Sequence, residues 1–369
     1  MLMEEIDYKN IGVDDVFGRY ITYDHINAFL NNLSIDFKIK VEGNSVRGES
    51  IKSITFGSGS KRVLMWSQMH GNESTTTKAV IDLLNLFKLD IPESSGILKA
   101  CTIKIIPILN PDGAKLYTRA NANRIDLNRD AQELTQPESR VLKRVYEHFH
   151  PDFCFNLHDQ RTIFNVGTTN RPATVSFLAP AFNEERDNSP SRKISMRLIA
   201  AMNTKLQKEI PGQVGRYNDS FNANCVGDAF QMRETPTILF EAGHYKNDYN
   251  RDKTRVFIFK ALLKCLLTIK DDSISNYTVD QYLSIPENGK QYVDIVVVND
   301  DFEDNELTKS KIVPIQFKEV LSFDHIEFKP EIHHFEKAPL EFFGHKTLNC
   351  NVKKDVDWLR ENNFLKLLS

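Results

Sequence analysis

The chain has no hydrophobic run long enough to cross a membrane. Its length is 369 residues, and its longest apolar runs, such as residues 103–109, are far shorter than the roughly 20 residues that a membrane-spanning helix needs. The amino-terminal segment MLMEEIDYKN is acidic and lacks the apolar stretch of a secretory signal. We therefore expect a protein without a membrane partner that works in the cytoplasm.

Cysteine is sparse, and basic residues are not in excess. The five cysteines are odd in number, scattered and never spaced as C-x-x-C, so neither a disulfide framework nor a cysteine zinc site is expected. The 47 lysines and arginines against 50 acidic residues give a net charge of −3. This balance lacks the basic excess of a nucleic-acid-binding surface, so no nucleic-acid partner is expected.

Segments typical of strands and of helices alternate over about the first 270 residues. Continuous apolar runs of strand length indicate buried strands, and apolar residues recurring every three or four positions indicate helices. This alternation predicts an α/β fold, with a mixed, mostly parallel twisted sheet and helices on both faces. The expected strands are residues 61–68, 101–109, 152–157, 174–179 and 235–240, and the expected helices are 14–33, 74–88, 137–149, 190–209 and 249–270.

The pattern changes after residue 270. A polar stretch, DDSISNYTVDQ, is typical of a linker, and the strand-like run QYVDIVVVNDD follows it. Long helical periodicity does not return until residues 355–368. We therefore predict two units, a catalytic domain over residues 1–275 and a small, mostly β appendage over 276–369.

A short motif, His70-Gly71-Asn72-Glu73, follows the first predicted buried strand. An imidazole and a carboxylate at this spacing can bind one zinc ion, and a third protein ligand would leave an open position for water. The motif alone is weak, because a second H-x-x-E match occurs at His333–Glu336. That second match is interpreted as a solvated charged stretch of the appendage.

The position of the first motif in the expected sheet strengthens its interpretation. His70, His158 and Glu241 each come at the end of a different predicted buried strand. In open α/β sheets, ligands bind beyond the carboxyl ends of the strands. Each residue has an ordinary structural explanation when taken alone, but their joint placement favours a site.

A polar segment after the strand at 101–109 adds groups that recognise carboxylates. It starts with the turn Asn110-Pro111-Asp112-Gly113 and continues through TRANANRIDLNRD. Arg119 and Arg129, with Asn128 between them, are suited to planar contact with a carboxylate or with a developing oxyanion.

These segments together resemble the zinc carboxypeptidase family, the funnelins of carboxypeptidase A/B type. The matching segments are SVRGESIKSITFGSG, MHGNEST, NPDG with TRANANRIDLNRD, FNLHDQ and TPTILFEAG. They occur in the order found in the family and cover roughly residues 40–270. The resemblance implies a metallocarboxypeptidase that hydrolyses the C-terminal amide bond of a peptide or peptide-like substrate.

The resemblance also assigns the reacting groups. His70, Glu73 and His158 would bind one catalytic Zn²⁺ ion, and Glu241 would be the general base and acid that activates water. Arg119 would polarise the scissile carbonyl and stabilise the oxyanion.

Further residues of the matching segments would bind substrate or orient a ligand. Asn128 and Arg129 would hold the substrate's free α-carboxylate. Asp126 would orient a zinc-binding imidazole. The family uses a mobile tyrosine about twenty residues before the catalytic glutamate, and Tyr217 is the candidate here, although no motif marks it.

The sequence departs from the usual family pattern at several positions. Asp130 stands where an asparagine is usual, and Asp159 adds a negative charge beside His158. His244 is expected to be an incidental neighbour of the site or a rim residue. The segment 222–231 is expected to form the specificity pocket; Asp228 within it could read a basic side chain, but a structural role is favoured.

Two other functions remain open. The sequence Glu-Ala-Gly at 241–243 resembles the aspartoacylase and succinylglutamate desuccinylase branch, which cleaves N-acyl amino acids. An amidohydrolase of that type, or an amidase of peptidoglycan fragments, would use the same zinc site. A catalytically silent module that binds a carboxylated ligand is disfavoured, because every essential position is filled.

Overall fold

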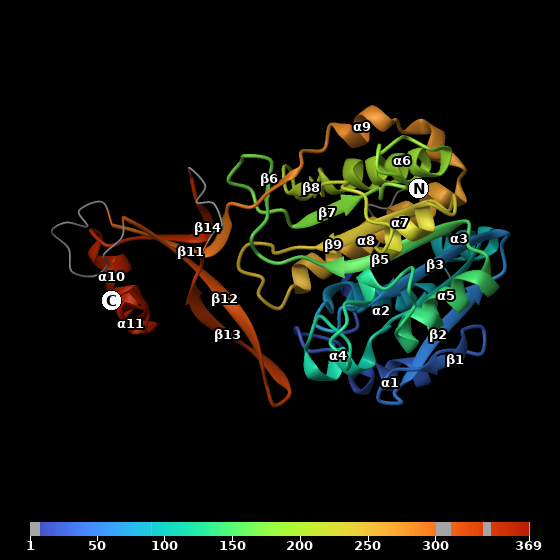
Figure 1. The fold of residues 1–369 in the computed structure, drawn as a ribbon, viewed down its shortest axis with the longest axis horizontal. Helices are drawn as coiled ribbons and strands as arrows, with labels where there is room; N and C mark the ends of the chain where they lie inside the picture. The colour runs from blue at the N-terminus through green and yellow to red at the C-terminus, as the bar shows by residue number, and fades with distance from the viewer. Residues whose placement is uncertain (1–7, 90, 300–310, 335–340, 369) are drawn as a thin grey trace.

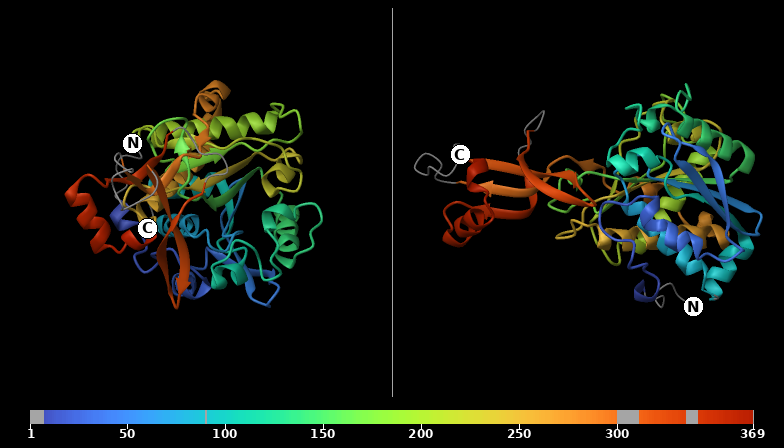
Figure 2. Two further views of the ribbon diagram at one scale, coloured as in Figure 1. Left: turned by 60° about the vertical axis from the view of Figure 1, so that its left-hand side comes forward. Right: turned by 90° about the horizontal axis from the view of Figure 1, so that it is seen from below.

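The chain folds into a large α/β unit and a smaller β unit near its carboxyl-terminal end (Figure 1). The computed structural model describes residues 8–89, 91–299, 311–334 and 341–368. In the view from below, the smaller unit projects from one side of the larger one (Figure 2). In the described part of the chain, no helix has the length and apolarity needed to cross a bilayer.

The large unit is built on an eight-stranded sheet in the order β1-β2-β4-β3-β5-β9-β7-β8. Its centre, β4-β3-β5-β9, is parallel throughout, whereas β1, β2 and β4 pair antiparallel and β7 runs antiparallel to β9. This confirms the prediction of a mixed, mostly parallel sheet. The strands are β1 (Lys38–Asn44), β2 (Ser50–Gly57), β3 (Lys61–Ser67), β4 (Cys101–Ile106), β5 (Phe153–Asp159), β7 (Val175–Leu178), β8 (Val214–Arg216) and β9 (Thr237–Ala242).

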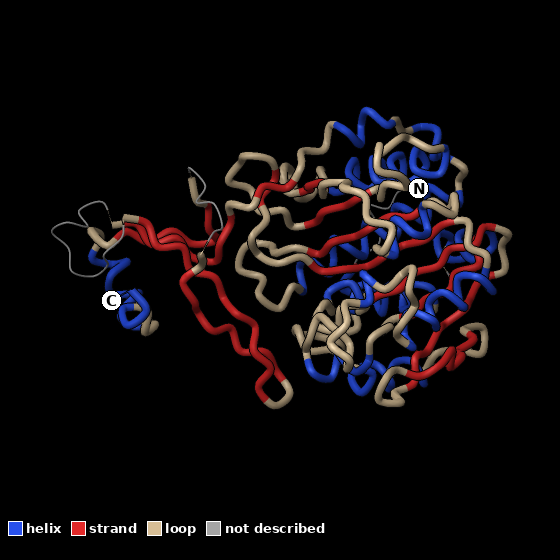
Figure 3. The backbone as a smooth tube through the Cα atoms, in the orientation of Figure 1, coloured by secondary structure: helices blue, strands red, loops and turns tan. Residues whose placement is uncertain are grey.

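Helices cover both faces of this sheet, as predicted (Figure 3). One face packs against α1 (Tyr23–Asn31), α2 (Thr75–Phe87), α3 (Pro92–Ala100), α6 (Pro190–Leu206) and α8 (Asp252–Lys270). The other packs against α5 (Pro137–Phe149) and α7 (Val226–Gln231).

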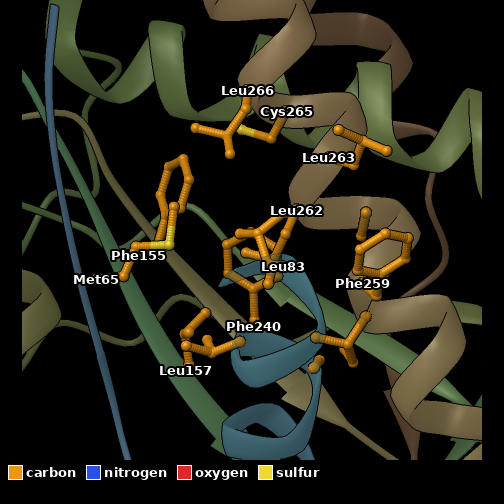
Figure 4. Packing of buried hydrophobic residues seen from close by; sticks show 14 of the residues in the cluster. Met65, Leu83, Phe155, Leu157, Phe240, Phe259, Leu262, Leu263, Cys265 and Leu266 are labelled. Atoms are coloured by element: carbon orange, nitrogen blue, oxygen red, sulfur yellow. The ribbon is translucent and has the colours of Figure 1, made fainter. Parts of the chain in front are cut away.

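The alternation of side chains along β3 explains this two-sided packing. Val63 and Met65 belong to the core beneath α2 and α8, while Leu64 and Trp66 belong to the core beneath α5. All four are fully buried, because successive side chains of a strand point to opposite faces. Figure 4 shows the first core, where strand residues such as Met65 and Phe240 lie opposite the leucines of α8. Each such side chain stabilises the fold by about 1.5–3 kcal/mol.

The structure changes the bounds of expected elements and adds a helix between two of them. The helix expected at 14–33 covers only Tyr23–Asn31, and α3 is a helix that the sequence analysis did not predict. Its nine residues include a proline and a glycine and bury only Ser94 and Ile97, so no apolar stripe marked it. The last strand, β9, continues to Ala242, so Glu241 lies within the end of the strand instead of after it.

The carboxyl-terminal part forms its own sheet, in the order β13-β12-β11-β14. A small core joins this sheet to two closing helices through Leu359, Phe364 and Leu368. His333 and His334 follow β13, but residues 335 and 336 of the second H-x-x-E match lie outside the described residues. The elements are β11 (Tyr292–Val298), β12 (Ile312–Ser322), β13 (His325–Ile332), β14 (Phe343–Asn349), α10 (Lys353–Glu361) and α11 (Leu365–Leu368).

The first residues of the predicted appendage pack on the large unit. Helix α9 (Val279–Leu283) and the following turn contribute Tyr282 and Ile285 to the main core. Strand β10 (Asn288–Gly289) pairs with β6 (Asn165–Val166) of the large unit. The division of the chain at residue 275 stays a prediction.

A buried ionic network joins the long β12–β13 hairpin to the large unit. Arg19 lies between two carboxylates, 2.8 Å from Asp159 and 3.2 Å from Glu319 of β12. The Tyr117 hydroxyl also donates to Glu319. These contacts place the hairpin beside a cavity that Glu73 and Asp159 line together with Glu319.

We expect Glu319→Ala to lower the free energy of unfolding by about 2–3 kcal/mol, because it removes a carboxylate from a largely buried pair and leaves Tyr117 without its acceptor. The matched control is Glu327→Ala on β13, whose side chain is 42% exposed and pairs with Lys329 at 3.3 Å and with Ser322. Its effect should stay within about 0.5 kcal/mol. Urea unfolding measures both. Equal effects of the two substitutions would contradict the network.

Candidate active site

The candidate site lies where three parallel strands end. Strands β3, β5 and β9 are neighbours in the sheet, so their carboxyl ends meet at one edge. His158 and Glu241 are direct partners in the β5–β9 pairing. His70 follows β3 by three residues. The fold thus brings together the three residues that the sequence placed at separate strand ends.

The turn between β3 and α2 is held by Gln68, which the sequence analysis missed. Its side-chain amide donates to the carbonyl of Gly71 at 2.8 Å, and its carbonyl accepts from Thr77 at 2.8 Å. Gly71 is required here, because a Cβ atom at this position would lie 2.0 Å from the backbone of Gly113. A lone glutamine carries no signal in a sequence, so only the folded chain reveals this role.

His70, Glu73 and His158 present their ligand atoms to one point. Nδ1 of His70 lies 2.9 Å from Oε1 of Glu73, and Nδ1 of His158 lies 2.8 Å from Oε2. The two Nδ1 atoms are 3.0 Å apart. All three residues are buried, and their ligand atoms lie within 4.8 Å of one another. Two nitrogens and a carboxylate are the donor set that zinc takes in catalytic sites.

The hydrogen bonds around His70 test whether a metal fits this donor set. Nε2 of His70 lies 2.9 Å from Oδ1 of Asp126, a carboxylate that can only accept. When Nε2 carries the proton, Nδ1 of the neutral ring presents a lone pair toward Glu73 and His158. Facing lone pairs repel one another unless a cation lies among them, so the residues fit a bound metal ion. The Asp126–His70 contact is the carboxylate support typical of metal-binding histidines.

Buried charge shifts the pKa values of the two glutamates in opposite directions. Burial favours the neutral form of Glu73, but the charges of His70 and His158 outweigh it and hold its pKa well below the usual range. Burial and the negative charge of Glu73 raise the pKa of Glu241 well above the usual range. One carboxyl is therefore tuned to stay ionised and the other to take up a proton readily, which is the division of roles that acid–base catalysis uses.

Arg119 lies on the solvent side of this cluster. It donates to Oε1 of Glu73 at 3.2 Å and to Oδ2 of Asp126 at 3.1 Å. Its side chain is 51% exposed, so a ligand can reach it. Asp126 also accepts from the backbone of Asn128 at 2.9 Å, which fixes the loop that carries the next two residues.

A cavity of about 570 Å³ contains the predicted substrate-binding residues. Asn128, Arg129 and Tyr217 line it together with the three metal-ligand candidates, Arg119 and Glu241. The Asn128 side chain accepts from the backbone of Val226 at 3.1 Å, which ties this loop to α7. Asp126 is not among the lining residues and contacts the site through His70 and Arg119.

Tyr217 occupies one wall of the cavity, directly after β8. Its ring packs against Phe164 at a centroid distance of 5.1 Å. Burial and the charge of Glu241 raise the pKa of its hydroxyl, which stays protonated and able to donate. The structure thus brings together all the residues that the sequence analysis selected for the site.

Comparison with known proteins places the chain among peptidases. The profile of the zinc carboxypeptidase family matches residues 24–222, more than half of the chain. The chain belongs to the zinc carboxypeptidase family. The matched range ends before Glu241, so the fold rather than the profile brings Glu241 to the site.

Individual relatives are distant. Probable carboxypeptidase 2 of Arthroderma benhamiae is 28% identical over 149 residues, 38% of this chain and 27% of that protein. Gamma-D-glutamyl-L-diamino acid endopeptidase 1 of Lysinibacillus sphaericus is 33% identical over 82 residues, 20% of this chain and 21% of that protein. The alignments thus span about a quarter of the length of these curated relatives.

A solved structure shares the fold. A metallo-carboxypeptidase from Burkholderia cenocepacia superposes with a TM-score of 0.55 and 17% identity, over 69% of this chain and 70% of that chain. At this identity the likeness shows the fold alone.

Two positions where the chain departs from the family pattern have structural partners. Asp159 turns to the start of α2, where it accepts from the backbone of Thr75 at 3.0 Å, and it pairs with Arg19. Its negative charge is therefore largely balanced. Asp130 accepts from the backbone of Thr135 and Gln136, each at 2.9 Å, and shapes the loop before α5.

Of the two expectations for His244, that of a rim residue is wrong, and that of an incidental neighbour remains. Its exposure is 4%, and it faces Asp294 and His345 of the carboxyl-terminal sheet instead of the cavity. His244 faces the carboxyl-terminal sheet because β9 ends at Ala242 and the chain then turns toward β11 and β14.

The specificity segment lies where it was predicted, with Gly227 and Asp228 on the cavity wall. The neighbouring Val226 packs into the core instead. Burial raises the pKa of Asp228 to about 7, although the backbone of Asn222 donates to its carboxyl group at 3.4 Å. Burying a carboxyl group with such a long hydrogen bond lowers the stability of the fold. Residues that contact ligands often lower stability in this way.

The stability of the protein should report this shift. Between pH 4 and pH 7 the unfolded chain ionises Asp228 while the folded chain keeps the proton, so the wild type loses stability as pH rises through this window. We expect Asp228→Asn to have little effect at pH 4 and to stabilise at pH 8, by about 1.4 kcal/mol for each unit of pKa difference. Urea unfolding at the two pH values measures this. The prediction would be contradicted if Asp228→Asn raised the free energy of unfolding equally at both pH values. It would also be contradicted if Asp14→Asn, at an exposed position, had the same effect.

Proposed function

We propose that the protein is a zinc-dependent carboxypeptidase that removes the C-terminal residue of a peptide or peptide-like substrate. The observation that carries the proposal is the shared cavity. The cavity joins a His-Glu-His donor set and a loop with Asn128 and Arg129. It also contains Glu241, whose pKa is raised and which pairs with His158 across the two strands. Membership in the zinc carboxypeptidase family supports the same reaction.

The metal and Glu241 divide the chemistry of water activation. Zinc bound by His70, Glu73 and His158 would supply Lewis acidity, lowering the pKa of a water molecule to about 7 and polarising a carbonyl. Glu241 takes the proton of the attacking water and returns it to the leaving amine. Its raised pKa suits this role, because a carboxylate of higher pKa is the stronger proton acceptor.

The basic residues of the cavity position the substrate. Arg119 donates to the scissile carbonyl oxygen and stabilises the negative charge that develops there. Arg129 and Asn128 hold the terminal carboxylate, for which a planar guanidinium offers two parallel hydrogen bonds. The Tyr217 hydroxyl, at the end of β8, donates to the substrate.

We expect Glu241→Gln to lower kcat about 10³-fold while the zinc content stays at the wild-type level, because the amide cannot accept the proton. Removal of metal by a chelator should abolish activity, and zinc should restore it. The assay is mass spectrometry of residues released from a library of peptides with free carboxyl termini. Undiminished hydrolysis by the Glu241→Gln variant, or by the metal-free protein, would contradict the proposal.

Recognition of the terminal carboxylate can be tested separately. Arg129→Ala should lower kcat/KM about 10- to 100-fold for a peptide acid, since a hydrogen bond to a charged group is lost. It should leave the much weaker cleavage of the corresponding peptide amide nearly unchanged. Arg124→Ala in the same loop, outside the cavity, is the matched control. An equal loss on acid and amide would show that Arg129 does not bind the carboxylate.

A second substrate class uses the same site. The L. sphaericus relative is named for cleaving a γ-D-glutamyl-L-diamino acid bond, which favours a peptidoglycan-type amide as the alternative. Hydrolysis of γ-D-glutamyl peptides or N-acyl amino acids in preference to α-linked dipeptides would select this alternative. A cytoplasmic location, which remains part of the proposal, would suit recycled fragments of either kind, and cell fractionation tests it.

A further inference from the structure

A second group of potential metal ligands lies outside the active-site cavity. His244, Asp294 and His345 are all buried, and their ligand atoms come within 4.8 Å of one another. His244 follows the strand that carries Glu241, whereas Asp294 and His345 belong to β11 and β14. The cluster therefore forms only where the carboxyl-terminal sheet meets the large unit.

The register of the carboxyl-terminal sheet places two of these residues side by side. Strands β11 and β14 pair in parallel, with Val293 opposite Gly344 and Ile295 opposite Lys346. Asp294 and His345 occupy the row between these pairs, so their side chains lie on the same face. The His244 ring lies against His345, with ring centroids 4.0 Å apart.

Several polar atoms of the cluster have no hydrogen-bond partner of acceptable geometry in the part of the chain that the structure describes. They are Nε2 of His244, Oδ1 of Asp294 and both ring nitrogens of His345. The three residues are only 4%, 1% and 5% exposed. Leaving a buried polar atom without a partner costs about 1–3 kcal/mol, so four such atoms at one point need an explanation. A metal ion would satisfy three of them together, Nε2 of His244, Oδ1 of Asp294 and one ring nitrogen of His345.

The remaining atoms of the ligands are held from outside the cluster. Oδ2 of Asp294 accepts from the backbone of Phe317 at 2.7 Å and from Gln316 at 2.6 Å. The Thr162 hydroxyl lies 3.1 Å from Nδ1 of His244. Contacts of this kind orient metal ligands by fixing the atoms that do not bind the metal.

The space and the charge also suit a cation. Nδ1 of His244 lies 3.8 Å from Oδ1 of Asp294, too far for a hydrogen bond, so the imidazole and the carboxyl group do not satisfy each other directly. A cavity of about 10 Å³ adjoins both residues, about the volume of one small probe. Three cationic side chains act on the two histidines, Arg251 on both, Arg19 on His244 and Lys246 on His345. The charges of Asp159 and Glu319 oppose that of Arg251. The Tyr249 ring packs against His244 and Phe317, and its hydroxyl hydrogen-bonds to the Asp294 carboxyl group.

We propose that His244, Asp294 and His345 bind a second divalent transition-metal ion of the zinc type, which fastens the carboxyl-terminal sheet to the strand end of Glu241. Two imidazoles and one carboxylate suit zinc and leave one position for another ligand. The site is structural, since its residues do not line the active-site cavity.

Zinc stoichiometry of the full chain tests the proposal. The protein is stripped with a chelator and titrated with zinc against a chromophoric competitor, and bound metal is measured after gel filtration. We expect two equivalents for the wild type. The double variant His70→Ala/His158→Ala, which lacks the catalytic ligands, should keep one. Loss of all zinc from that double variant would overturn the proposal. This test leaves His244, Asp294 and His345 unchanged, so it does not disturb the folding of the new site.

A second variant removes the proposed ligand itself. His345→Phe keeps a ring in the buried position and should reduce the wild-type stoichiometry from two to one. His325→Phe, at a histidine whose side chain is 62% exposed on β13, is the matched control and should keep two. If His345→Phe does not fold, Asp294→Asn takes its place. Two equivalents in the ligand variant would overturn the proposal. Zinc should also raise the unfolding temperature of the double variant, and this rise should vanish when His345→Phe is added.

Discussion

The parallel pairing of β3, β5 and β9 is the constraint on which the rest of the site depends. Parallel neighbours bring their carboxyl ends to one edge, so side chains far apart in the sequence meet without any local motif joining them. The direct pairing of His158 with Glu241 sets the distance between a proposed metal ligand and the glutamate proposed to transfer the proton. The apolar side chains of both cores hold these strands in register.

Several carboxylates lie close together at this edge of the sheet, and their negative charges repel one another. The surroundings of each carboxylate differ, and so does its charge state. Glu73 stays ionised between two imidazoles, with Arg119 on its outer side. Asp159 is balanced by Arg19, which also reaches the carboxyl-terminal sheet. Glu241 has no such cation in direct contact among the described residues, so burial and the negative charges of Glu73 and Asp159 raise its pKa. The uncompensated carboxyl is the one suited to carry a proton.

Much of this arrangement could be predicted from the sequence, because the signals are local. The apolar run of β3 and the proline at the start of α5 mark elements that the structure reproduces within a residue. The segment TRANANRIDLNRD is distinctive enough for Arg119, Asn128 and Arg129 to be predicted as site residues from the sequence. Each of these depends on neighbouring residues or on strand ends that one fold class brings together.

The interactions that escaped prediction are long-range. Arg19 and Glu319 are 300 positions apart, and nothing in either segment points to the other. The direction of His244 depends on where β9 ends and on a sheet formed by later residues. Gln68 acts through a turn whose geometry appears only in the folded chain. Such contacts follow from tertiary packing rather than from periodicity or composition.

The central claim is that three strand ends build one zinc centre beside Glu241. Anomalous diffraction from zinc-loaded crystals, recorded on both sides of the zinc absorption edge, tests it most directly. The account predicts a strong anomalous peak in contact with Nδ1 of His70, Nδ1 of His158 and the Glu73 carboxylate, with Glu241 on the adjacent strand. A fully active crystal without a peak at this position would contradict the account.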